Sequence, residues 1–150
     1  MINSQQKTES PLGDSPLSRM LTDTELAEEI VKSSAPIPFK GGETLFKQGD
    51  LPAHAFFVKT GEVILTMRKS GNAEWKIRAG EGSILGLPAI ISNEPYSLNA
   101  TVSRDSDICR ISRENFHQLM QENPRFCCNV VQILAGEVLA ARSALSRLLG

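Results

Sequence analysis

The stretch from Ser83 to Val102 (SILGLPAIISNEPYSLNATV) holds the residues of this chain whose types and spacing suggest binding chemistry. Gly86 precedes a short apolar run that Pro88 opens, so the sequence predicts a strand that turns at a glycine into a proline-started helical turn. The free backbone N–H groups of such a helix start attract anions. The stretch therefore predicts a small-ligand pocket set inside a β structure.

The bulk properties of the chain are those of one globular domain. It has 150 residues, 41% hydrophobic and 22% charged, and its net charge of −1 gives no basic surface for nucleic acid. No apolar run approaches the roughly 18 residues of a membrane span, and the N-terminus lacks the pattern of a secretory signal. The cysteines are Cys109, Cys127 and Cys128, which do not form a disulfide framework. We therefore expect a cytoplasmic protein.

Short strands between turn residues are expected from Ile37 to Ser112. The turns recur roughly every 8 to 12 residues, a spacing typical of a β sandwich or jelly roll. Two adjacent antiparallel pairs are predicted, Ala55–Lys59 with Glu62–Met67 and Ser97–Val102 with Asp107–Ile111. The expected fold class is mainly β with flanking helices, a jelly-roll β roll (double-stranded β-helix) of about eight strands.

Helices are expected before and after the roll. Thr22 and Glu25 form a capping box that predicts a helix over 23–33. Ser112 predicts the cap of a short helix whose apolar residues share one face: Phe116, Leu119 and Met120. The domain prediction has three segments: a disordered tail (1–17), an N-terminal helix with the β roll and short helix (18–123), and a C-terminal dimerisation helix (124–150).

The last helix carries a heptad pattern. Pro124 starts it, and its apolar residues then recur at alternating steps of three and four: Val131, Leu134, Val138, Ala141, Leu145 and Leu148. A seam this regular favours a two-helix dimer contact. The alternative is a helix that packs on its own β roll.

Three runs, in this order, resemble the cyclic-nucleotide-binding domain of the Crp/Fnr superfamily of bacterial regulators. They are TLFKQGDLPAHAFFVKTGEV, GEGSILGLPAIISNEPYSLNATV and ICRISRENFHQLMQENP. The second is similar to the phosphate-binding cassette of that family, and we call residues 86–97 the cassette. The resemblance implies a non-enzymatic sensor or regulatory module, a homodimer whose effector binds between the roll and the long helix. The helix-turn-helix that normally follows is not in the sequence, so direct DNA binding by this chain is not expected.

The resemblance also implies a set of ligand-binding positions: Gly86, Leu87, Pro88, Ala89, Tyr96, Ser97, Leu98, Ala141 and Arg142. Leu87 stands at the family's glutamate position and Tyr96 at its arginine position. Leucine cannot accept a ribose hydroxyl, and tyrosine offers a phosphate only one neutral hydroxyl. Each lost charged hydrogen bond costs about 1.5–3 kcal/mol. Cyclic AMP or cyclic GMP should therefore bind about 10²–10⁴-fold more weakly, or not at all.

The residues leave two alternative functions open. The domain could be an effector-independent protein-interaction dimer whose pocket is filled by Leu87, Tyr96 and Leu98, or a binder of a cyclic nucleotide or another anionic effector with altered pocket chemistry. A cupin-type metal enzyme would share the jelly roll, but two histidines, His54 and His117, are too few for its site. No metal or cofactor is expected.

Overall fold

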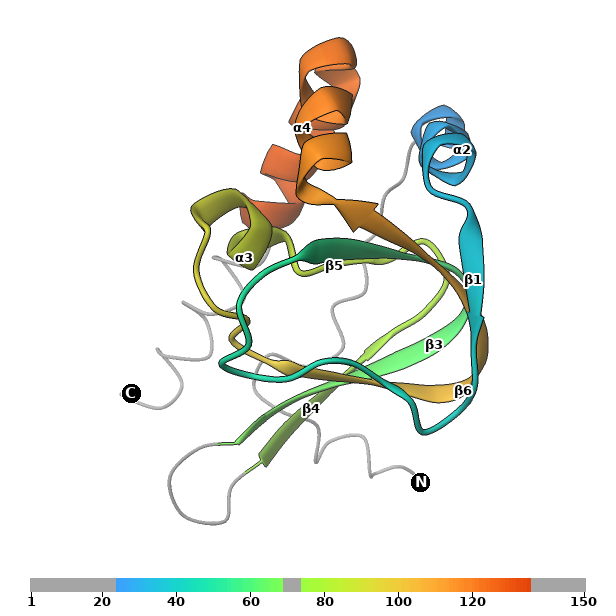
Figure 1. The fold of residues 1–150 in the computed structure, drawn as a ribbon, viewed down its shortest axis with the longest axis vertical. Coiled ribbons are helices and arrows are strands. Elements are labelled where there is room, and N and C mark those ends of the chain that lie inside the picture. The colour runs from blue at the N-terminus through green and yellow to red at the C-terminus, as the bar shows by residue number, and fades with distance from the viewer. Residues whose placement is uncertain (1–23, 69–73, 136–150) are drawn as a thin grey trace, which may run out of the picture.

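The computed structural model describes residues 24–68 and 74–135, which form an antiparallel β structure with helices gathered at one end (Figure 1). Along the chain the elements are α2 (Thr24–Ser33), β1 (Pro36–Phe39), β2 (Thr44–Phe46), β3 (His54–Arg68), β4 (Glu74–Ala79), β5 (Ile84–Leu85), α3 (Leu87–Ser92), β6 (Asn99–Ser112) and α4 (Arg113–Glu122). A further helix occupies residues 124–135. Within this part of the chain, no helix is long and apolar enough to cross a membrane.

The strands belong to a single sheet with the order β1-β6-β3-β4, in which β2 also pairs with β6 and β5 with β3. Every pairing is antiparallel. The prediction of a mainly β fold with flanking helices is confirmed. The described residues contain six strands in place of the expected eight or so.

The difference in strand number comes from β3 and β6, which are each continuous where two shorter strands were expected. Phe57 pairs with Cys109, and Leu65 pairs with Ala100, so one long strand follows the other from end to end. The two predicted hairpin pairs are therefore wrong. Near Gly61 the register shifts, and this residue has φ +102°. A bulge of this kind bends a strand without reversing it, and its glycine has the same local signature as a turn.

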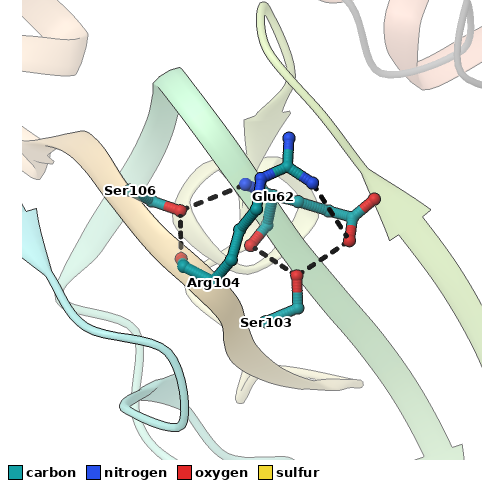
Figure 2. Close-up of polar contacts among 4 residues, drawn as sticks. All are labelled: Glu62, Ser103, Arg104 and Ser106. Atoms are coloured by element: carbon teal, nitrogen blue, oxygen red, sulfur yellow. Dashed lines mark hydrogen bonds and ion pairs between the residues drawn. The ribbon is translucent and has the colours of Figure 1, made fainter.

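Ser106 and three neighbouring residues fix the geometry of the bend (Figure 2). The Ser106 hydroxyl accepts a hydrogen bond from the Glu62 amide at 3.1 Å and donates one to the Arg104 carbonyl at 2.7 Å. The Ser103 hydroxyl donates to Glu62 Oε1 at 2.8 Å, and Arg104 Nη1 lies 3.8 Å from the same oxygen. A Cβ on Gly61 would lie 2.7 Å from the Ser106 Cα, so only glycine fits at this crossing, the point where β3 passes close to Ser106 of β6.

Two hydrophobic clusters lie on opposite faces of β3, because side chains alternate along a strand. Ala55 and Phe57 belong to the helix-side cluster, whereas Phe56 and Val58 belong to the roll-side cluster. The helix-side cluster contains Leu26, Ile30, Ala55, Phe57, Ile84, Leu87, Ile90, Cys109, Ile111, Phe116, Leu119, Phe126, Val130 and Ile133. The roll-side cluster contains Phe46, Phe56, Val58, Val63, Leu65, Ile77, Ala79, Leu85, Ala89, Tyr96, Ala100, Val102 and Ile108.

Two predicted helices match the structure closely. Helix α2 covers Thr24–Ser33, and its predicted cap, Thr22, lies outside the described residues. Ser112 caps α4, since its hydroxyl accepts a hydrogen bond from the Asn115 amide at 3.1 Å. The three residues predicted to share a face of α4 do so: two are buried and one is half-buried, namely Phe116, Leu119 and Met120.

The helix over 124–135 buries one face against the rest of the domain through Phe126, Val130 and Ile133. The predicted seam lies beside this face: Val131 is 61% exposed, and Leu134 is partly buried at the edge of the helix-side cluster. The remaining seam positions lie outside the described residues: Val138, Ala141, Leu145 and Leu148. The dimer therefore stays a prediction.

Candidate functional site

The cassette begins with a glycine that both its backbone conformation and its surroundings require. Gly86 has φ +84° and directly precedes the short helix α3. A Cβ there would lie 3.3 Å from the His54 carbonyl oxygen and 3.3 Å from the ring of Tyr96. The predicted path of strand, glycine and proline-containing helical turn is present, and α3 ends at Asn93 in the left-handed conformation.

Tyr96 points into the protein and is 5% exposed. Its hydroxyl donates a hydrogen bond to the His54 carbonyl at 2.7 Å. The hydroxyl oxygen of Tyr96 also accepts hydrogen bonds from the backbone amides of Ala53 and His54, each at 3.2 Å. The ring stacks on Phe46, with centroids 4.0 Å apart and planes 14° from parallel. The cassette position at which the resembling family has an arginine is therefore occupied here by a tyrosine that is packed and hydrogen-bonded inside the protein.

The backbone of Tyr96 binds the same segment as its side chain. The Gly49 amide donates to the Tyr96 carbonyl at 2.8 Å, and the Tyr96 amide donates to the Asp50 carbonyl at 3.0 Å. Residues 49–54 are therefore attached to the cassette at several points. Sequence reasoning noted the Gly49-Asp50 turn, but no local pattern linked it to a residue more than 40 positions away.

Leu87 lies on the other side of the β structure from Tyr96. It is 1% exposed and packs in the helix-side cluster together with Ile90 of α3 and Phe116 of α4. Tyr96 belongs to the roll-side cluster, and Leu98 packs against that cluster. The three side chains considered as fillers of one pocket are therefore divided between two clusters.

The other predicted site residues differ in how deeply their side chains are buried. Ala89 is buried in the roll-side cluster, whereas Pro88 and Ser97 are exposed. Ala141 and Arg142 lie outside the described residues, so their predicted ligand contact is not tested.

Two titratable groups near the cassette have shifted pKa values. Partial burial, assisted by the positive charge of Arg110, lowers the pKa of His54 below its usual 6.5. Burial raises the pKa of the Cys109 thiol, an effect that nearby Lys59 partly opposes. Among the described residues, no three His, Cys, Asp or Glu side chains gather in a way that could hold a metal ion. The cassette itself presents aromatic, aliphatic and backbone groups.

The far end of the cassette is joined to α4. Arg113 Nη1 donates a hydrogen bond to Asn93 Oδ1 at 2.6 Å, and Asn93 is the residue that terminates α3. The turn at Asn93 is visible in the sequence, but no local pattern predicts its contact with Arg113, which lies 20 positions further along the chain. Two cavities lined by described residues lie elsewhere, one of about 560 Å³ beside α2 and one of about 340 Å³ beside β1.

Comparison with known proteins places this arrangement in a family. The family model described as "Cyclic nucleotide-binding domain" matches residues 36–123. The transcriptional activator protein FnrA of Stutzerimonas stutzeri is 28% identical over 125 residues, which cover 82% of this chain and 50% of that protein. The transcriptional activator protein Anr of Pseudomonas aeruginosa is 27% identical with the same coverage. The chain thus spans about half the length of these curated relatives.

Solved structures show the same fold. The catabolite activator protein of Thermus thermophilus has a TM-score of 0.76 and 24% identity, and the match covers 89% of this chain and 63% of that one. The c-di-GMP-responsive regulator CLP of Xanthomonas campestris has a TM-score of 0.72 and 20% identity, with coverage of 85% and 65%. The family match extends over more than half of the 150 residues. The chain therefore belongs to the cyclic nucleotide-binding domain family and is of the Crp/Fnr-like type.

Proposed function

We propose that this chain is a non-enzymatic regulatory module whose phosphate-binding cassette no longer holds cyclic AMP or cyclic GMP with useful affinity. The observation that carries the proposal is the hydrogen bonding of the Tyr96 hydroxyl. The curated relatives are named as transcriptional activators, which supports a regulatory role.

A phenolic hydroxyl has one proton to donate and two lone pairs to accept with. Tyr96 donates its proton to the His54 carbonyl and accepts from the amides of Ala53 and His54. To donate to a phosphate, the hydroxyl must abandon the His54 carbonyl, and an unsatisfied buried group costs about 1–3 kcal/mol. An arginine would instead bring a positive charge and five N–H donors.

Leu87 contributes a second loss. Its side chain cannot accept a hydrogen bond, and it is buried against the helices. With about 1.5–3 kcal/mol lost for each of the two charged contacts, the affinity for a cyclic nucleotide falls about 10²–10⁴-fold. A receptor of micromolar affinity would then bind too weakly to respond to micromolar nucleotide.

Calorimetric titration with cyclic AMP and cyclic GMP tests this function directly. We expect no heat of binding at micromolar concentrations of either nucleotide. A cyclic-nucleotide-binding domain that retains the glutamate and the arginine is the positive control. A Kd of about 10 µM or tighter would refute the proposal, because such an affinity is not compatible with the loss of two charged contacts.

A second candidate is an effector-independent protein-interaction dimer, which the hydrogen-bonded and buried Tyr96 side chain favours.

For either function we propose dimerisation through the helix that starts at residue 124. The exposure of Val131 beside the buried face of this helix supports the proposal. Light scattering after gel filtration should give twice the monomer mass of 16.4 kDa. A monomer at tens of micromolar would refute the dimer.

A further inference from the structure

We propose that Tyr96 is an internal clamp, which holds the cassette against residues 49–54 without any ligand. The conformation of the cassette would then be set by the fold and not by an effector. This inference deepens the proposed function, on which it rests, by describing how the same site is regulated.

The clamp consists of hydrogen bonds from one residue to one short segment. The backbone of Tyr96 pairs with Gly49 and Asp50. Its hydroxyl bonds to the amides of Ala53 and His54 and to the His54 carbonyl. The two bonds at the start of this segment use the backbone of residue 96, which any amino acid would supply. Those at its end depend on the tyrosine hydroxyl.

The ring of Tyr96 joins two further elements. It stacks on Phe46 of β2 with a centroid distance of 4.0 Å. On another side it lies so close to Gly86 that a Cβ on that glycine would be 3.3 Å from a ring carbon. The side chain therefore fixes β2, the beginning of β3 and the beginning of α3 relative to one another. Because the Tyr96 side chain is largely buried and its hydroxyl bonds are partly buried, these bonds are stronger than they would be in open water.

The clamped cassette is attached to the helices that follow it. Asn93, at the end of α3, accepts a hydrogen bond from Arg113 of α4 at 2.6 Å. Leu87 and Ile90 of α3 pack in the same cluster as Phe126, which belongs to the helix over 124–135. A cassette held by Tyr96 therefore also holds a fixed surface for that helix. An effector can shift such an arrangement only if it binds a different state more tightly.

Hydrogen exchange of individual backbone amides in the full chain tests the clamp. Tyr96→Phe removes the hydroxyl and keeps the ring, so the fold should persist. The amides of Ala53 and His54 should then exchange about 3–10-fold faster, as expected for loss of one hydrogen bond. The Gly49 amide bonds to the backbone carbonyl of residue 96 and should keep its exchange rate. Ser92→Ala, at the exposed end of α3, is the control variant and should change none of the three amides.

Two results would overturn the clamp. One is exchange at Ala53 and His54 that stays within a factor of two of the unmodified protein. The other is an equal acceleration at Gly49, because that amide makes no bond to the hydroxyl. Nucleotide titration of the unmodified chain gives an independent result. A failure of the proposed function appears there as heat of binding, whereas a failure of the clamp appears only in the exchange rates.

Discussion

Replacing Gly61 by alanine should destabilise the chain strongly, because two penalties meet at this residue. Its φ of +102° is one that residues with a side chain rarely adopt, and a Cβ would lie 2.7 Å from the Ser106 Cα. Two other glycines separate these effects. Gly42 has φ +97° with nothing within 4 Å of an added Cβ, whereas Gly80 has open space and no positive φ.

The structure gives an order of magnitude for each substitution. Gly80→Ala should be neutral or should stabilise by about 0.4–1 kcal/mol, since alanine restricts the unfolded chain. Gly42→Ala should cost about 1–2 kcal/mol from backbone strain alone. Gly61→Ala adds overcrowding of about 1–3 kcal/mol to a similar strain, for a total of about 2–5 kcal/mol. The crowding cannot be relieved cheaply, because the Ser106 Cα is part of the paired strand β6.

Urea unfolding followed by circular dichroism measures all three variants in the same buffer. The free energies of unfolding should fall in the order Gly80→Ala, Gly42→Ala, Gly61→Ala. If the last two agree within about 0.5 kcal/mol, the crossing at the bend is looser than described and the reasoning is refuted. An unfolded Gly61→Ala protein beside a folded Gly42→Ala protein would support it, since a small domain has only about 5–15 kcal/mol of stability.

Three further predictions concern the cassette and its surroundings. Leu87→Glu should lower the free energy of unfolding by about 2–5 kcal/mol or more and Leu87→Met by less than about 1.5 kcal/mol, because residue 87 is buried among apolar side chains; equal melting temperatures would contradict this placement. Ser112→Ala should cost about 0.5–2 kcal/mol in urea unfolding because the Asn115 amide loses its acceptor, whereas Ser112→Thr should keep most of the stability. Burial and Arg110 lower the pKa of His54 in the folded chain, so the unfolded chain binds a proton at this residue more tightly. The contribution of His54 to the free energy of unfolding is therefore complete above pH 6.5 and declines as the pH falls below that value. Urea titrations between about pH 5 and 8 should show a flatter profile for His54→Gln, and an unchanged profile would exclude this histidine as a cause.

Elements with a complete local signal could be predicted from the sequence. The helix after Ser112 has its cap, its apolar face and the following proline in one stretch, and it forms where expected. The turn into α3 at Gly86 likewise depends on residues next to one another. In these places the residues that determine the structure lie within about ten positions of one another, so a local sequence pattern is enough to predict it.

The errors arose where distant residues decide the outcome. Gly61 has the same sequence signature whether it reverses a strand or bends it, and the choice depends on the crossing with Ser106. The position of Tyr96 depends on partners at Gly49 to His54, far away along the chain. The resemblance identified Leu87 and Tyr96 as unusual. It could not indicate that their side chains enter different clusters, because that depends on how the strands assemble.

The alternation along β3 has an evolutionary consequence. Ala55 and Phe57 pack against the helices, while Phe56 and Val58 line the roll. Mutations at every second position can therefore alter the lining of the roll without changing the side chains that pack against the helices. Insertion or deletion of a single residue in this segment would exchange the two sets of side chains at once. Such a strand tolerates changes in side-chain chemistry far better than changes in length.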